Sequence, residues 1–409
     1  MELITIVYLI MFFFGIYFLM MFLILFYRHR KDIESYPEPK RFPSVSFIVP
    51  AYNEEQSISN TINALLAVKY PLGKKEIIVV NDGSKDRTSE IVKSFMKNHK
   101  EVKLLDKPNS GKADSINQAL KIAKGELVAI TDADSYPEPD SLFKMIGYFE
   151  EDRNVAAVTS RVLVKNTKNF MEKYQAFDYV VIAWSRKILD YIDSVYVTNG
   201  PLSIYRSEVV KNLGGFDTKN LTEDIEITWR ILSKGYKTRM SYSTNVYTTV
   251  PSDFKKWVNQ RVRWNLGGLQ TIMKYRKYIF RGKNFFGFFV IPYVTLSFFL
   301  ALIGVALFMR YIWIKSSIWI FSIPYFLRGY NPFRFMEFSL PITLLLILGL
   351  IFFILAIWYY KAAIQGQEIK NKGILSILTY SIIYRSFYTI PLLICLYKLL
   401  RKDIRWYTK

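Results

Sequence analysis

Two carboxylates, Asp132 and Asp134, directly follow the apolar run from Leu127 to Ile130 in the stretch ELVAITDADSYPEPD. Residues two apart at the end of a strand point to the same side, so these two side chains can share one bound cation. Mg²⁺ and Mn²⁺ prefer oxygen ligands, and Mg²⁺ is typically held by one or two carboxylates together with substrate phosphates. The spacing therefore predicts a divalent metal site. The alternative is helix capping ahead of EPDSLFKMIGYFE.

Acidic segments also follow two earlier apolar runs, as VPAYNEE and NDGSKD. Taken singly, each segment is explained by a turn, since Asn-Asp-Gly is common in turns and Ser84 could cap a helix. Three acidic segments at one edge of a sheet are harder to explain in this way. We therefore expect them to form a shared binding site.

The scarcity of cysteine and histidine excludes several kinds of chemistry. Cys395 is the single cysteine, so a disulfide within the chain and a cysteine zinc cluster are excluded. His29 and His99 are the only histidines, which argues against a histidine zinc site or a Ser-His-Asp triad. Any reaction must then use carboxylates, cations and hydroxyl groups.

The formal net charge of +21 is compatible with binding to nucleic acid. In a chain with long apolar runs, this charge is better explained by attraction to anionic lipid headgroups and phosphorylated substrates. We therefore predict a lipid bilayer and a phosphorylated substrate as partners, and no nucleic acid.

Short apolar runs alternate with amphipathic stretches between residues 40 and 160. The strand candidates are VSFIVP, EIIVV, VKLLD, LVAIT and VAAVT, and the helical patterns include EEQSISNTINALLAV and TSEIVKSFMKNH. This alternation is typical of an α/β domain with a doubly wound, mostly parallel sheet that is covered on both faces. Ligands bind such sheets at the carboxyl ends of the strands, where the acidic segments lie.

The N-terminal stretch from Leu3 to Tyr27 contains no charged residue in 25 positions. At ~1.5 Å per residue this stretch can cross the ~30 Å hydrocarbon core of a bilayer. No small-residue cleavage site is apparent, which favours a retained transmembrane helix within residues 1–31 over a signal peptide. The basic segment RHRK follows, and basic flanks mark the cytoplasmic side. We therefore expect the polar region at about residues 40–280 to be cytosolic.

The C-terminal region, residues 284–409, is apolar again. Asn284–Met309 and Phe338–Tyr360 are uncharged runs of 26 and 23 residues, and both are predicted to span the membrane. Gly373–Tyr397 is long enough for a third span but carries Arg385 in its middle. An arginine there is costly, so its side chain should face protein, water or a headgroup rather than lipid.

Three C-terminal spans would place the basic tail RKDIRWYTK outside the cell, against the positive-inside tendency. An interfacial or re-entrant segment at Ser316–Leu327, or near Arg385, would avoid this. We therefore expect about four spans in all, or one fewer with an interfacial segment.

The motifs VPAYNEE, VNDGSKD, NSGKADSINQAL, TDADS, GGFD…LTEDIEITW and QRVRW occur in the order seen in family 2 inverting glycosyltransferases. Over about residues 44–270 the chain resembles the membrane-embedded processive synthases of hyaluronan, poly-N-acetylglucosamine, chitin and cellulose. NGPLSIYR is most similar to hyaluronan synthases, and LTEDIEITW to poly-N-acetylglucosamine synthases. The resemblance implies a cytosolic GT-A-like domain at 40–250 and amphipathic interfacial helices at 251–283.

The resemblance also implies roles for individual residues. The residues that it places at the UDP-sugar donor are Tyr52, Glu54 and Asp82, which hold the uridine, Lys112 near the nucleotide, and Asp132 and Glu223. Asp132 and Asp134 correspond to the metal motif, with Mg²⁺ or Mn²⁺ as cofactor. Asp224 of TED is the implied catalytic base.

These roles imply a single displacement. An acceptor hydroxyl attacks the anomeric carbon opposite the leaving diphosphate, and Asp224 accepts its proton from roughly 2.6–3.2 Å away. The cation on Asp132 and Asp134 neutralises charge on the departing diphosphate. An alternative explanation of LTEDIEITWRIL is a capped helix, with Thr222 as the cap and Glu223 and Asp224 in its first turn.

The stretch KKWVNQRVRWNLGG bears on the processive interpretation. Gln260, Arg263 and Trp264 share one face of a helix. Arg261 and Val262 should point elsewhere. The shared face offers an amide for sugar hydroxyls or phosphate, a guanidinium for diphosphate and an indole for an acceptor ring. The alternative is an interfacial helix at the headgroup layer, and both interpretations suit an active-site floor at the membrane.

Three features depart from the family's pattern. Threonine stands in YTTVPSD where many relatives have an acidic residue, one span rather than two precedes the cytosolic domain, and we expect no added regulatory domain. The leading hypothesis is a synthase that elongates a polysaccharide processively from a UDP-sugar and extrudes it. One alternative is transfer of one sugar to a lipid acceptor. A second is a non-catalytic membrane scaffold.

Overall fold

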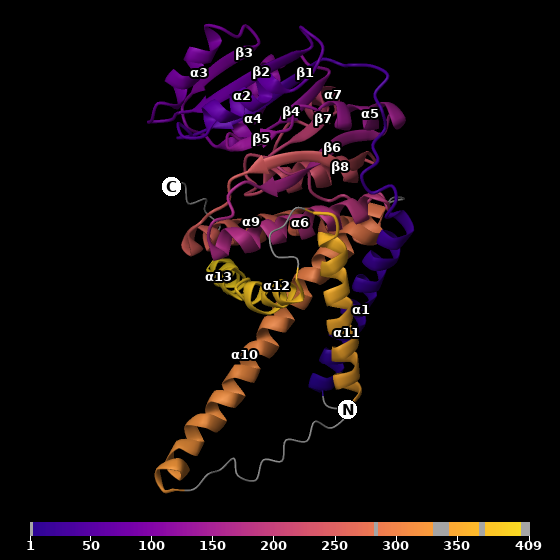
Figure 1. Ribbon diagram of the computed structural model, residues 1–409, viewed down its shortest axis with the longest axis vertical. Coiled ribbons are helices and arrows are strands. Elements are labelled where there is room, and N and C mark those ends of the chain that lie inside the picture. Colours follow the sequence, from indigo (N-terminus) through magenta and orange to yellow (C-terminus); the bar gives the residue numbers. More distant parts are fainter. Residues whose placement is uncertain (1–2, 282–284, 330–342, 368–372, 402–409) are drawn as a thin grey trace. The chain divides into compact units, whose positions relative to one another are not determined.

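A computed structural model describes residues 3–281, 285–329, 343–367 and 373–401 (Figure 1). The chain forms two compact units, which are described separately. The helical unit comprises Met1–Met21 and Tyr293–Tyr359, and the sheet unit comprises Phe22–Pro292 and Tyr360–Lys409. The predicted site residues all belong to the sheet unit.

The sheet unit contains an eight-stranded sheet with the order β3-β2-β1-β4-β7-β6-β8-β5. The strands are β1 Val45–Ala51, β2 Lys75–Asp82, β3 Val102–Lys107, β4 Leu127–Ile130, β5 Ser135–Pro137, β6 Val155–Val164, β7 Ser203–Arg206 and β8 Lys237–Thr248. The first four strands pair in parallel. β7 is antiparallel to both β4 and β6, β8 is parallel to β6, and β5 is antiparallel to β8.

The predicted α/β class is confirmed, and all five predicted strands are present as β1, β2, β3, β4 and β6. The sheet is mixed, however, because β7 enters between β4 and β6 in the opposite direction. The other three strands, β5, β7 and β8, were not predicted. β5 and β7 have only three and four residues, too few to produce an alternating pattern, and β8 interleaves polar residues along its length.

The helices of the sheet unit are α2 Ile58–Ala67, α3 Thr88–Met96, α4 Lys112–Ile122, α5 Phe143–Glu151, α6 Phe170–Asp190, α7 Ser207–Asn212, α8 Glu223–Ser233, α9 Phe254–Tyr275, η1 Arg276–Tyr278, η2 Phe286–Val290, α12 Ile374–Leu378, η3 Thr379–Tyr384 and α13 Thr389–Leu400. Successive strand residues point to opposite faces. Phe47 of β1 therefore packs with α2 and α5 on one face, whereas Ile48 packs with α4, α7 and α8 on the other. Both faces are covered, as predicted.

Two long helices, α6 and α9, lie between the β6–β8 part of the sheet and the C-terminal helices α12 and α13 (Figure 1). Each begins at a cap. The Asn169 side chain accepts a hydrogen bond from the Glu172 N–H at 2.9 Å, and Glu172 accepts one from the Asn169 N–H at 3.2 Å, which forms a capping box at α6. At α9, Asp253 accepts from the Lys256 N–H at 2.9 Å. These caps set where each helix starts.

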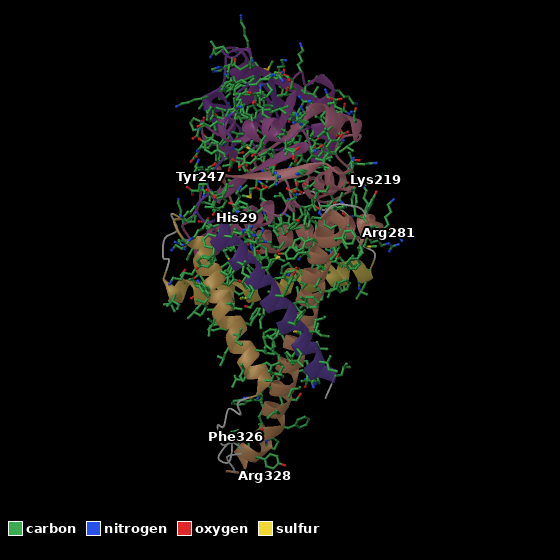
Figure 2. All side chains as sticks on the ribbon, turned by 90° about the vertical axis from the view of Figure 1, so that its right-hand side faces the viewer. His29, Lys219, Tyr247, Arg281, Phe326 and Arg328 are labelled. Atoms are coloured by element: carbon green, nitrogen blue, oxygen red, sulfur yellow. The ribbon has the colours of Figure 1, made fainter. Side chains whose placement is uncertain are left out.

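The helical unit contains most of α1 Leu3–His29, α10 Ile291–Leu327 and α11 Leu344–Ile364. Within it, α1 meets α10 through Phe18 and Tyr293, whose ring centroids are 5.0 Å apart, and meets α11 through Phe12 and Phe352 at 6.2 Å. Helix α10 ends at Leu327; Phe326 in its last turn and Arg328 just after it are labelled in Figure 2.

Four helices among the described residues are long and apolar enough to cross a membrane: Leu3–His29, Phe286–Leu327, Leu344–Ile364 and Ile374–Leu400. They occupy the regions predicted to span, and together they indicate a membrane protein. Ser316–Leu327 forms the last part of the continuous helix α10 rather than a separate segment. Residue 284, residues 338–342 and the basic tail from 402 onward lie outside the described residues.

Candidate active site

Hydrogen bonds join the loops that follow β1 and β2 at the carboxyl edge of the sheet. Asn53, with φ of 55°, donates its N–H to Ser84 Oγ at 3.0 Å, and its Oδ1 accepts from the Lys85 N–H at 2.9 Å. Ser84 therefore joins the two loops and does not cap α3, whose N-cap residue is Arg87 and makes no side-chain cap bond. The capping explanation of Ser84 is wrong.

Asp82, at the end of β2, holds the loop that leads into α4. Its two carboxylate oxygens accept the N–H groups of Ser110 and Gly111, each at 2.9 Å, and Lys107 pairs with the same carboxylate. Gly111 has φ of 96°, a conformation that glycine adopts without steric cost. Asp82 thereby fixes the start of α4, at which Lys112 lies.

Lys112 brings two distant carboxylates together. Its Nζ lies 2.6 Å from Oδ1 of Asp132 and 2.8 Å from Oε1 of Glu223. Burial alone would lower the pKa of Lys112, but the negative charges of Asp132 and Glu223 outweigh burial and raise it. The lysine is therefore charged at neutral pH and links the end of β4 to the start of α8.

Asp134 lies among carboxylates, which is the donor set that a hard cation requires. Burial, followed by the charges of Asp132 and Glu54, raises the pKa of Asp134 to about 7. A divalent cation would relieve this repulsion, so Asp132 and Asp134 fit the predicted metal role. No group of three or more potential protein ligands occurs within the described ranges, so substrate phosphates would have to complete the coordination.

Helix capping does not account for the two aspartates. The N-cap residue of α5 is Leu142, and no side chain caps that helix. Asp134 instead accepts weak hydrogen bonds from Ser135 Oγ at 3.3 Å and Thr248 Oγ1 at 3.5 Å.

Asp224 lies in the first turn of α8, directly after Glu223. Burial and then the charge of Glu223 raise its pKa to about 6, whereas Lys112 acts in the opposite direction. The Glu223 pKa is lowered, because Lys112 outweighs the effect of burial there. Thr222 occupies the N-cap position and Glu223 and Asp224 lie in the first turn, as the capped-helix alternative predicts, but the Thr222 side chain makes no cap bond and instead donates to Asn220 Oδ1 at 3.2 Å. The five carboxylates Glu54, Asp132, Asp134, Glu223 and Asp224 are called the acidic cluster below.

Helix α9 packs directly against the start of α8. A Cβ atom at Gly267 would lie only 2.3 Å from Thr222 Oγ1, so the two helices meet where Gly267 has no side chain. The Arg263 charge lowers the pKa of both Glu223 and Asp224, which brings the QRVRW motif within electrostatic reach of the acidic cluster. Arg263 is itself exposed.

The other residues of the motif lie farther along α9. Gln260 and Trp264 are half-buried. Arg261, which was predicted to point away, lies with its guanidinium carbon 4.0 Å from the centre of the Trp264 ring, and its Nη1 is 3.5 Å from Gln260 Oε1. Arg261 therefore contacts Trp264 and Gln260, two of the three residues of the predicted motif face. Tyr52 is half-buried in the loop after β1, and no contact among the described residues joins its side chain to the acidic cluster.

Three further residues at the site were not selected from the sequence. A Cβ atom at Gly200, in NGPLSIYR, would lie 2.6 Å from Asp132 Oδ2 and 2.8 Å from Lys112 Nζ. On α6, burial raises the pKa of Tyr179, and the negative charge of Asp134 adds to that shift. Burial lowers the pKa of Arg186, and the negative charge of Asp224 opposes that shift. Their seven-residue spacing, which places Tyr179 and Arg186 on one face of α6, was the available signal.

This arrangement of sheet and helices is similar to a solved GT-A-type structure. A mannosyltransferase from Pyrobaculum calidifontis, in complex with GDP-Man and Mn²⁺, matches with a TM-score of 0.59 over 94% of this chain and 95% of that chain, at 22% identity. The fold is therefore that of the GT-A glycosyltransferases. Residues 43–267, more than half of the chain, match the family described as Glycosyltransferase like family 2, and the chain belongs to that family.

Curated relatives are similar over the same region. Poly-beta-1,6-N-acetyl-D-glucosamine synthase from Staphylococcus epidermidis strain RP62A is 30% identical over 239 residues, which are 58% of this chain and 57% of the relative. The protein of the same name from Staphylococcus aureus strain COL is 30% identical over 231 residues, 56% of each chain. The chain thus spans little more than half the length of these relatives.

Proposed function

We propose that this protein is a membrane-embedded inverting glycosyltransferase that transfers sugar from a UDP-sugar to a growing polysaccharide and extrudes the product. The observation that carries the proposal is the bridge from Lys112 to Asp132 and Glu223, at 2.6 and 2.8 Å. This bridge joins Asp132 of the expected metal motif to Glu223, the residue next to the expected base Asp224. Similarity to the staphylococcal synthases supports a donor with N-acetylglucosamine.

Asp224 acts as the general base. With a pKa of about 6 it is mostly ionised at neutral pH and still basic enough to take a proton from an acceptor hydroxyl. Glu223 stays ionised beside Lys112 and keeps the Asp224 pKa raised. The proton moves to Asp224 as the hydroxyl oxygen bonds to the anomeric carbon and the bond to the diphosphate oxygen breaks.

The donor side is organised by Asp132, Asp134 and Lys112. Asp132 and Asp134 would hold Mg²⁺ or Mn²⁺, which supplies positive charge at the leaving diphosphate. Lys112 holds Asp132 in place, and the exposed guanidinium of Arg263 offers a forked donor to phosphate oxygens. Tyr52, Glu54 and Asp82 line the edge at which uridine would bind.

The acceptor side is formed by α9. The Trp264 ring, supported by Arg261, offers a flat apolar surface for a sugar ring, and Gln260 offers hydrogen-bonding groups. In this proposal residues 40–250 form the catalytic domain on the cytoplasmic side, residues 251–283 the interfacial helices, and residues 1–31 and 284–409 the membrane region. The +21 charge favours contact with anionic lipid.

The test is to incubate the protein in lipid nanodiscs with a panel of radiolabelled UDP-sugars and Mg²⁺ or Mn²⁺, and to measure UDP release and product size. We expect a ladder of long chains from UDP-N-acetylglucosamine. A single lipid-extractable product with one added sugar would instead support the glycolipid alternative. UDP release no faster than that of Asp224→Asn, with every donor, would support the scaffold alternative.

A further inference from the structure

Asp178, on α6, is a buried carboxylate that the proposed reaction does not use. Its side chain is 1% exposed. The Tyr380 hydroxyl donates to Oδ1 at 2.7 Å, and the Tyr388 hydroxyl donates to Oδ2. Arg261 Nη2 lies 3.3 Å from Oδ2, and Arg385 Nη1 lies 3.8 Å from Oδ1. These five residues are called the Asp178 cluster.

The Asp178 cluster joins three parts of the chain that are far apart in sequence. Asp178 comes from α6, Arg261 from α9, and the two tyrosines and Arg385 from the C-terminal apolar segment Ile374–Leu400. A further hydrogen bond in the same layer runs from Trp257 Nε1 of α9 to the Tyr384 hydroxyl, at 3.1 Å. The motif helix is thus tied by directional polar contacts to a helix of membrane-spanning character.

Stability alone is a weak reason for such a cluster. Burying a charged group is costly, and well-packed apolar residues often stabilise a protein as much as a buried ion pair does. Hydrogen bonds and ion pairs differ from apolar contacts because they specify direction and distance. Asp178 also offers a partner to Arg385 of the apolar segment, whose Nη1 lies 3.8 Å away while its side chain stays half-exposed.

The contacts of Asp178 extend through Arg261 to Trp264, the residue proposed to bind the acceptor sugar. Asp178 contacts the Arg261 guanidinium, and the centre of the Trp264 ring lies 4.0 Å from the guanidinium carbon. Arg261 is 2% exposed, so it has little freedom to move. A change at Asp178 would therefore reach Trp264 through the Arg261 side chain.

We propose that Asp178 is a positioning residue. It holds Arg261 in contact with the Trp264 ring and joins α9 to the C-terminal apolar segment Ile374–Leu400. The acceptor sugar on Trp264 is thereby kept at the correct distance from Asp224. This inference rests on the proposed function. Loss of Asp178 should impair transfer to the acceptor while leaving nucleotide binding unchanged.

The experiment compares Asp178→Asn with Asp190→Asn in full-length protein in lipid nanodiscs. Asp190 is a matched control: it lies on the same helix, is 4% exposed, and pairs with Lys187 at 2.9 Å. Asp190 also contacts the Met240 N–H and Arg239, which belong to β8 rather than α9. The readouts are UDP affinity, UDP release, sugar incorporated per UDP released, product length and thermal unfolding.

Misplacement by ~1 Å can cost a reaction up to about 10²-fold, so Asp178→Asn should slow transfer to the acceptor. Water does not depend on Trp264 for its position, so it still attacks the anomeric carbon and releases UDP together with free sugar. We therefore expect incorporation per UDP released to fall by about tenfold and the product to be shorter. The UDP affinity of Asp178→Asn should match that of the wild type. Asp190→Asn should lower the unfolding temperature without changing incorporation per UDP or product length. Equal incorporation per UDP in both variants and the wild type would overturn the inference.

A second variant covers the case in which Asp178→Asn does not fold. Arg261→Lys keeps the positive charge but loses the planar fork that contacts Asp178 and Trp264 together. It should also reduce incorporation per UDP, and wild-type values would overturn the inference. Where both variants fold, the double variant should be no worse than Asp178→Asn alone, because the two residues act as a unit. If the wild type itself transfers no sugar, the proposed function fails instead, so the two failures are distinguishable.

Discussion

The ammonium group of Lys112 lies 2.8 Å from the carboxylate of Glu223, the residue immediately before Asp224. The same ammonium group lies 2.6 Å from Asp132, at the end of β4. One cation thereby connects the two carboxylate motifs that the proposed reaction needs at its donor and acceptor sides. Removal of any member of this bridge should therefore affect both sides, whereas changes to residues beyond it should affect one.

Asp224→Asn should reduce sugar transfer by about 10²–10⁴-fold, because an amide cannot accept the acceptor proton and general-base catalysis contributes a factor of that size. UDP affinity should stay close to the wild-type value, since Asp224 acts on the acceptor. Transfer rates and calorimetric UDP titration measure the two effects. A large loss of UDP affinity would assign Asp224 to the donor site instead.

Sugar transfer should depend on pH with a midpoint near 6. The Asp224 pKa is raised to about 6, so the carboxylate becomes protonated, and loses its function as a base, as the pH falls through that value. Glu223→Gln removes a negative charge that raises this pKa, so the midpoint should shift to lower pH. Rate profiles from pH 5 to 8 for both proteins check the shift. An upward shift would show that Glu223 does not act in this way.

Asp134→Ala should weaken UDP binding in the presence of Mn²⁺ and have little effect in its absence, because the carboxylate is expected to contact the cation rather than the nucleotide. Calorimetric titration of UDP with Mn²⁺ and with EDTA measures the difference. Asp140→Ala, in which the lost carboxylate is half-exposed and paired with Lys144 at 2.6 Å, is a control that should bind UDP normally. Unchanged metal dependence in Asp134→Ala would contradict the assignment.

Gly200→Ala should reduce transfer while the protein stays folded. The added Cβ would lie 2.6 Å from Asp132 Oδ2 and 2.8 Å from Lys112 Nζ, and must displace one of these two groups. Gly268→Ala is the matched control, because nothing lies within 4 Å of the added Cβ and the residue is in α9, where alanine favours the helix by roughly 1 kcal/mol. Circular dichroism and transfer rates distinguish the variants. Equal activity in both would show that the space at Gly200 is not required.

Local patterns in the sequence predicted much of the fold. Apolar runs such as VSFIVP and LVAIT became β1 and β4, because a strand buried on both faces leaves a continuous apolar signature. The strands β5 and β7 are too short for such a signature. Both strands pair antiparallel with their neighbours, so the sheet, which was predicted to be mostly parallel, also contains antiparallel pairs.

Local signals misassigned Ser84 and gave only the position of Thr222. Ser84 suits a helix cap by residue type but is not the N-cap residue of α3. Thr222 is the N-cap residue of α8, as predicted, but its side chain makes no cap hydrogen bond. Ser84 accepts from Asn53, on another loop, and Thr222 faces Gly267 of α9. Cap propensity describes one helix end at a time, and packing between elements decides which partner such a side chain takes.

The sequence by itself determined the α/β class, the long apolar helices and the identity of the carboxylates at the strand ends, because periodicity, hydropathy and motif order are local properties of a chain. Only the tertiary structure decided that Lys112 joins Asp132 to Glu223 and that Arg261 contacts both Asp178 and Trp264. These contacts link residues that are far apart along the chain. Their charges interact strongly only because packing brings them within a few ångströms and excludes water.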